Sequence, residues 1–128
     1  MYKKRVLKWS NLFFLIPLII AINYNIYWYA IIVFTVMIIS FDYHLFNETR
    51  DVYYLDRFFS LILMIANFIL LFKGHWVLPY SFFAITFAIS AIYFYVQKSL
   101  YTYYFNHSFW HIFAAGTCVF CLITLLSF

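Results

Sequence analysis

The sequence predicts an all-α integral membrane protein, a helical bundle with about five transmembrane helices. Hydrophobic residues make up 68% of the 128 positions and charged residues only 9%, and the mean hydropathy is +0.93. A soluble domain of this length could not bury so much apolar surface. We therefore expect residues 1–128 to form a single transmembrane domain.

The few polar interruptions divide the chain into apolar stretches near the roughly 20 residues that cross a hydrocarbon core of about 30 Å. The first stretch is short and carries Pro17. The fourth has Pro79 in its first turn, where the missing N–H costs little. The expected spans are residues 10–22, 26–46, 55–72, 76–96 and 104–128.

The first span also resembles the apolar core of a signal peptide, because basic residues precede it. A cleavage site with small residues at the usual spacing is missing, since Ala21 is followed by Ile22 and Asn23. Cleavage would also leave an even number of spans. We therefore expect this segment to stay in the protein as the first membrane helix.

The distribution of Lys and Arg predicts the orientation. When the five spans alternate, all but one of these eight residues fall on the same side of the membrane, and the exception is Lys73. The positive-inside rule makes that shared side cytoplasmic, which places the N-terminus inside. The net charge of +4 comes from the N-terminal run at the membrane surface and does not indicate a nucleic-acid partner. The residues on the shared side are Lys3, Lys4, Arg5, Lys8, Arg50, Arg57 and Lys98.

Five polar side chains stand out in the apolar spans: Ser40, His44, Asp56, His107 and His111. Ser40 and His44 are four residues apart, as are the two later histidines, so in helices each pair projects from one face. The predicted topology places all five on the cytoplasmic side. Three neutral imidazoles suit Zn2+ and leave its fourth tetrahedral position for a water that becomes a hydroxide nucleophile. The pattern predicts a metal hydrolase with the three histidines as zinc ligands.

The same residues resemble, in type and order, the pattern of the CREST superfamily of membrane hydrolases, which includes the alkaline ceramidases and the progestin and adipoQ receptors. The chain has Ser40-Phe-Asp-Tyr-His44, then Asp56, then His107-Ser-Phe-Trp-His111. The resemblance implies that the histidines bind zinc. It also implies that Ser40 and Asp56 hold the metal-bound water.

The resemblance covers residues from about 33 to 115 and implies a shortened version of the family architecture. Family members place three spans between the Asp helix and the last helix, whereas one span intervenes here. Losing a pair of spans preserves the orientation of the last helix, so the ligands can still converge, but the wall of the substrate cavity loses two helices. A homodimer could rebuild that wall. Trp110, directly before the second histidine of the motif, is similar to the ceramidase version.

By this resemblance the substrate is a membrane lipid, either a lipid amide such as ceramide or a lipid ester. Asp56 would take the proton of the water and pass it to the leaving group, while Ser40 would orient the water or donate to the oxyanion. Two other classes stay open. One is a non-enzymatic receptor or scaffold with a closed zinc site. The other is a cytochrome in which His44 and His111 bind haem.

The remaining polar residues have structural interpretations. Asp56 could equally serve as a helix N-cap or first-turn anion. Asp42 lies about 200° around the helix from Ser40 and should face away from the site. His75 falls in a loop on the opposite side. The cysteines of the last span, at positions 118 and 121, have no basic neighbour and are expected to pack as small buried side chains.

Overall fold

The computed structural model describes residues 9–45, 50–97 and 103–128, without the side chains of residues 44, 45, 103 and 104. Across these ranges the chain forms helices and no strand. The all-α prediction is confirmed, and each helix overlaps one of the five expected spans. The elements are η1 (Leu12–Phe14), α2 (Leu15–Asn23), α3 (Tyr27–Leu45), α4 (Arg50–Lys73), α5 (Tyr80–Val96) and α6 (Tyr103–Ser127).

Some boundaries differ from the predicted ones for local reasons. The first span contains the 3-10 turn η1, because Pro17 has no N–H to donate to the carbonyl of Phe13 in a regular helix. Helix α4 begins at Arg50, five residues before the expected start, and Asp51 in its first turn is favoured by the helix dipole. Helix α5 begins late, at Tyr80, because the preceding turn has two residues with positive φ that a helix cannot contain.

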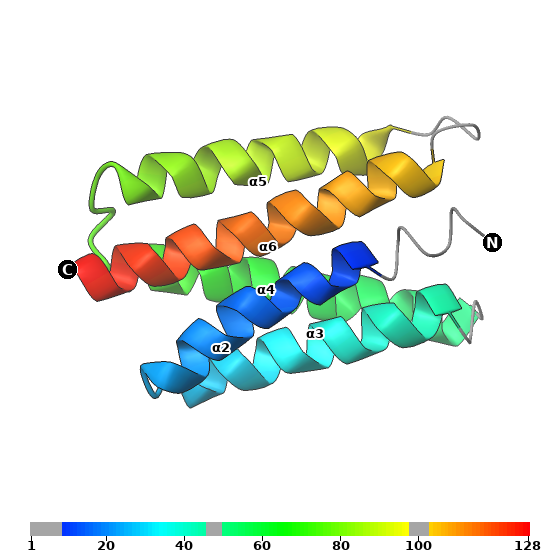
Figure 1. Ribbon diagram of the computed structural model, residues 1–128, viewed down its shortest axis with the longest axis horizontal. Helices are drawn as coiled ribbons and strands as arrows, with labels where there is room; N and C mark the ends of the chain where they lie inside the picture. Colours follow the sequence, from blue (N-terminus) through cyan, green and yellow to red (C-terminus); the bar gives the residue numbers. More distant parts are fainter. Residues whose placement is uncertain (1–8, 46–49, 98–102) are drawn as a thin grey trace.

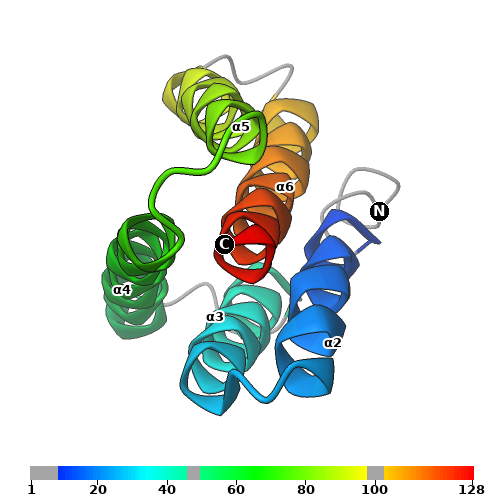
Figure 2. The ribbon, with the colours of Figure 1, turned by 90° about the vertical axis from the view of Figure 1, so that its left-hand side faces the viewer.

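Successive helices run in opposite directions, so the bundle has two distinct ends (Figure 1). The C-terminal end of α3 and the N-terminal ends of α4 and α6 lie at one end, which we call the site end. Helix α6 is central: it packs against α2, α4 and α5, while α3 packs against α2 and α4. Helices α4 and α5 both pack against α6 but stand apart from each other (Figure 2).

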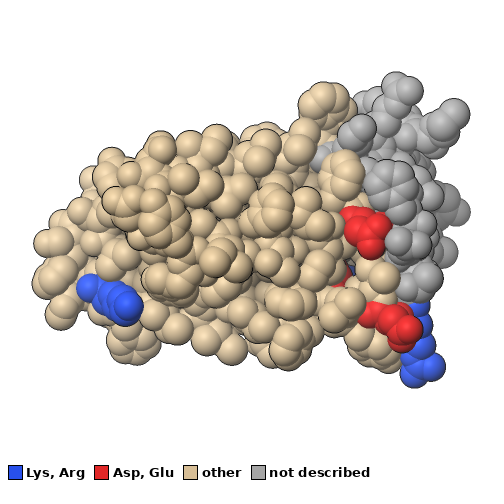
Figure 3. All heavy atoms as spheres, turned by 90° about the horizontal axis from the view of Figure 1, so that it is seen from below, with Lys and Arg blue, Asp and Glu red and all other residues tan. Residues whose placement is uncertain are grey.

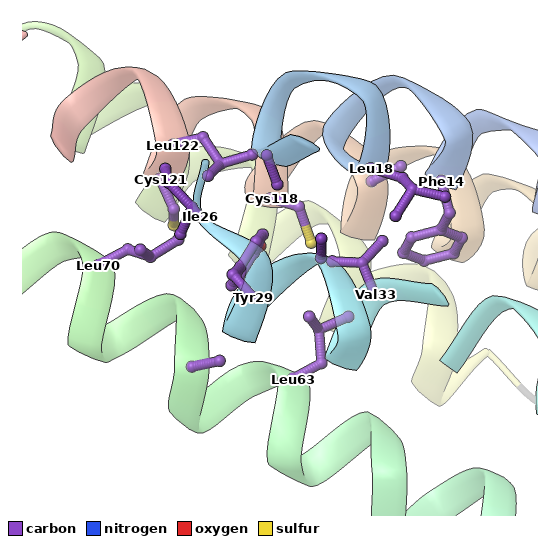
Figure 4. Close-up of a cluster of buried hydrophobic side chains, with 14 of the residues drawn as sticks. Phe14, Leu18, Ile26, Tyr29, Val33, Leu63, Leu70, Cys118, Cys121 and Leu122 are labelled. Carbon is purple, nitrogen blue, oxygen red and sulfur yellow. The ribbon is translucent and has the colours of Figure 1, made fainter. Parts of the chain in front are cut away.

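The core lies where α2, α3, α4 and α6 meet (Figure 4). Tyr29 is fully buried there, and its hydroxyl donates a hydrogen bond to Asn67 of α4. Cys118 and Cys121 of α6 are buried and not joined in a disulfide. Their predicted role as packing residues is confirmed.

Helices α5 and α6 approach closely through one glycine and a stack of aromatic rings. A Cβ atom at Gly116 would overlap the ring of Phe87. Phe94 stacks on Phe109 and Phe113, with ring centroids 5.0 and 5.5 Å apart. The missing side chain at position 116 therefore allows α5 to lie against the central helix.

The outer surface carries large apolar side chains, among them Ile31, Phe72 and Ile89, which are 66%, 66% and 63% exposed. Among the described residues on the face seen in Figure 3, charged side chains lie only near the two ends of the bundle. Two helices, Arg50–Lys73 and Phe105–Ser127, are long and apolar enough to cross a membrane. The other apolar helices are shorter. The number of membrane spans, about five, and the orientation of the chain therefore stay predictions.

Candidate active site at the site end of the bundle

Helix α6 supplies two histidines to the interior of the site end. His107 and His111 are 5% and 0% exposed, and their ring centroids are 4.8 Å apart in an edge-to-face arrangement. Residues four apart in a helix share a face. The structure therefore places the two imidazoles together, as the spacing predicts.

Ser40 reaches the same place from α3. Its side chain is 2% exposed, and its Oγ lies 3.4 Å from Nε2 of His111. The sequence separates these residues by 71 positions. The antiparallel course of the helices thus joins one member of the Ser-x-x-x-His motif to one member of the His-x-x-x-His motif.

Ser10 also contacts His111, although no motif in the sequence indicates a functional role for it. The Oγ atom of buried Ser10 lies 3.0 Å from Nδ1 of the imidazole. Next to it, Asn11 donates from Nδ2 to the carbonyl of Met37 at 3.1 Å, which anchors the start of the first helical segment to α3. The sequence feature that could have indicated this contact is the pair of adjacent polar residues at the start of an apolar stretch. Polar side chains that are buried there need hydrogen-bond partners.

The contacts on both ring nitrogens fix the orientation of His111. When the Nδ1 hydrogen is donated to Ser10, the lone pair of Nε2 faces Ser40. A histidine that binds a metal through Nε2 usually donates its Nδ1 hydrogen to a hydrogen-bond partner of this kind. The same geometry would orient an imidazole that accepts a proton from a hydroxyl.

Asp56 lies at the same end of the bundle, on α4. It is 1% exposed, and neither carboxylate oxygen has a hydrogen-bond partner among the described residues. Oδ2 lies 3.7 Å from Nη1 of Arg57. Since α4 begins at Arg50, Asp56 stands in the second turn, so the interpretations as a helix N-cap and as a first-turn anion are both wrong. A buried carboxylate with unfilled acceptor positions is suited to receive a proton or a water.

A cavity of about 430 Å³ lies between α4 and α5 and has α6 and α3 in its wall. Ser40 and His111 form a polar part of this wall, and Arg57 forms another. The described lining of the cavity does not include Asp56. Several lining residues of α4 and α5 are about half exposed, so the cavity reaches the outer surface between these two helices. Its apolar lining includes Leu61, Met64, Phe68, Ala88, Ile92 and Ala114.

The predicted zinc ligands are described only in part. The side chain of His44 lies outside the described residues, and among those described no group of three or more His, Cys, Asp or Glu side chains could hold a metal ion. His107 and His111 provide two imidazoles of the predicted three. His75 lies in the loop at the opposite end, where its ring stacks on Phe128 at 3.9 Å, as expected of a residue outside the site.

The positive charges that predicted the orientation are also described in part. Arg50 and Arg57 lie in the first turns of α4 and Lys73 ends that helix, so these charges lie toward opposite ends of α4. The side of the membrane that each end faces stays a prediction. Lys98 and the basic N-terminal run lie outside the described residues.

Comparisons with family models, with curated proteins and with solved structures found no match to this chain.

Proposed function

We propose that this protein is a zinc-dependent membrane hydrolase that cleaves the acyl group from a lipid. One observation carries the proposal: buried His111 and Ser40 form a polar wall of an apolar cavity that reaches the surface between α4 and α5. Apolar cavities with a few convergent polar groups are the usual sites for small apolar ligands. A hydrocarbon chain would occupy the apolar part and bring its carbonyl to the two polar side chains.

The surface of the bundle supports a location in the bilayer. Large apolar side chains project outward from all the long helices, which a soluble monomer would leave in contact with water. The proposed arrangement is multi-pass with a cytoplasmic N-terminus, which puts the site end and its cavity near the cytoplasmic face. Lipid could then enter sideways between α4 and α5 without leaving the membrane.

The residues at the site end have the chemistry that a zinc site needs, with His107 and His111 as two ligands and His44 proposed as the third. Bound zinc supplies a Lewis acid and a hydroxide at neutral pH. Ser10 would hold Nδ1 of His111 so that Nε2 is presented to the site.

Two further side chains would serve the reaction itself. Asp56 would accept a proton from the attacking water and return it to the leaving group. Ser40, beside Nε2 of His111, would orient that water or donate a hydrogen bond to the developing oxyanion. Amides such as ceramide and acyl esters both suit this chemistry. In a homodimer, the second copy would complete the cavity wall beside the opening between α4 and α5 and leave that opening free for lipid.

The proposal is tested with the purified full chain in detergent, given a panel of ceramides and acyl esters, with release of fatty acid as the readout. Zinc should support release, a chelator should stop it, and added zinc should restore it. The His75→Ala variant serves as the matched histidine control, because that ring lies at the opposite end. Bound zinc without release from any member of the panel would favour a receptor or scaffold, and an intense Soret band would favour a cytochrome.

A further inference from the structure

Arg57 occupies an unusual position, between three helices at the site end. Its guanidinium carbon lies 4.9 Å from the ring centroid of Tyr53 on α4, 4.9 Å from that of Tyr95 on α5, and 5.9 Å from that of Trp110 on α6. The side chain is 23% exposed. Because α4 and α5 stand apart, this arginine and its aromatic neighbours close one end of the space between them.

Some hydrogen-bond donors of this guanidinium have no partner among the described residues. Nε and Nη1 are buried and have no hydrogen-bond partner among the described residues. The ion pair with Asp56 has an Nη1 to Oδ2 distance of 3.7 Å, too long for a good hydrogen bond. Buried charged donors without partners are costly, so the position favours an anion that arrives with a ligand.

Arg57 lines the same cavity as Ser40 and His111. A free fatty acid would need only one polar position, because its charge and its carbonyl are the same group. Ser60, Asn67 and Thr117 also line the cavity, but their side chains form hydrogen bonds within the protein. The two other polar positions, one at His111 and Ser40 and one at Arg57, suit a ligand with an acyl carbonyl and a separate anion. Arg57 is also about 10 Å along α4 from Arg50, a depth at which a long side chain can still meet a headgroup near the interface.

We propose that the cavity binds an acyl lipid whose headgroup carries a phosphate, with the phosphate on Arg57 and the hydrocarbon chain between α4 and α5. The guanidinium keeps its positive charge and has N–H donors that can bond to phosphate oxygens. This inference rests on the proposed function for the place of the acyl carbonyl. It narrows the substrate class, because ceramide carries no charge.

The test is equilibrium binding of two ligands that differ only in the phosphate: a hexadecyl glyceryl ether and its phosphate ester. Neither has an acyl bond, so binding is measured without hydrolysis and its outcome does not depend on the zinc chemistry. In an uncharged detergent, the wild-type chain should bind the phosphate ester roughly tenfold more tightly or better, as expected of one charge-assisted hydrogen bond. Equal binding of the two ethers would overturn the proposal.

Three variants distinguish the contribution of the Arg57 charge to binding from that of the apolar cavity. Arg57→Gln should lose the preference for the phosphate ester and keep its affinity for the uncharged ether. Arg50→Gln, which removes an exposed arginine from the same helix, should keep the preference. Ala88→Phe, which fills the cavity, should weaken both ligands. A preserved preference in Arg57→Gln would overturn the assignment.

If Arg57→Gln binds neither ether, Arg57→Lys decides the question, because it restores the charge with a similar length. A phosphate preference in this variant supports the proposal, and its absence overturns it.

Discussion

Ser10 Oγ and His111 Nδ1 lie 3.0 Å apart across 101 positions of the sequence, and both side chains are buried. The contact connects the start of the first helical segment to the centre of the candidate site. It holds the imidazole with Nε2 facing Ser40, and Nε2 is the atom that would bind zinc in the proposed site. The contact makes the first helical segment part of the site.

Ser10→Ala should therefore weaken zinc binding by about 10 to 100-fold, the effect typical of removing the hydrogen-bond partner of a metal-binding histidine. Ser10→Thr keeps a hydroxyl and should restore much of the affinity. Competition against a chelator of known affinity gives the measurement. Ser90→Ala is the matched control, because the hydroxyl of Ser90 donates to the carbonyl of Thr86 within its own helix, α5. Unchanged affinity in Ser10→Ala would show that the contact is only structural.

The zinc site itself is tested by removing its imidazoles. The purified chain should hold about one zinc, and His107→Ala or His111→Ala should each remove most of it, because two remaining ligands bind zinc poorly. Metal content is measured by atomic spectroscopy, with His75→Ala as the control. Full zinc occupancy in the double variant of the two α6 histidines would contradict the site.

Asp56 and Ser40 should affect turnover more than metal. Asp56→Asn keeps the size of the side chain but cannot accept a proton, so it should retain zinc and lose about 10² to 10⁴-fold in hydrolysis. Ser40→Ala should lose about 10 to 10³-fold, because it removes one hydrogen bond to the water or oxyanion. Asp51→Asn, at an exposed carboxylate in the first turn of α4, should behave as wild type. Hydrolysis by Asp56→Asn at the wild-type rate would exclude the proton-transfer role.

The orientation can be tested on one helix. Single cysteines at Arg50 and Lys73 mark the two ends of α4, and the native Cys118 and Cys121 are buried. In sealed vesicles, an impermeant thiol reagent should reach the Lys73→Cys variant from outside and the Arg50→Cys variant from the cytoplasmic side, as the positive-inside rule predicts. Labelling of both variants from the same side would show that α4 does not span the membrane.

The close approach of α5 to α6 gives a stability prediction. Gly116→Ala should destabilise the fold by about 1–3 kcal/mol, because the new methyl group overlaps the ring of Phe87. In a Phe87→Ala background the same change should cost less, since the ring is gone. Unfolding in detergent, followed by loss of helicity, measures both effects. An equal cost in the two backgrounds would mean that the two positions do not interact.

Local pattern was sufficient for much of this molecule. The all-α class and the place of each helix follow from long apolar stretches interrupted by a few polar segments, which is information held within each stretch. The shared face of His107 and His111 follows from the helical period alone. The burial of Cys118 and Cys121 follows in the same way from their apolar surroundings.

The start of α4 at Arg50 was not predicted, because a helix can continue past the apolar stretch through polar residues at its end. The N-cap interpretation of Asp56 failed for that reason. The role of Ser10, the aromatic surroundings of Arg57 and the cavity between α4 and α5 depend on contacts between helices distant in sequence. Such contacts depend on how each helix is rotated and displaced against its neighbours. The residue pattern of a single helix does not determine this rotation or displacement. The sequence by itself determined the helices and the faces of their motifs, and only the tertiary structure decided which of those faces meet.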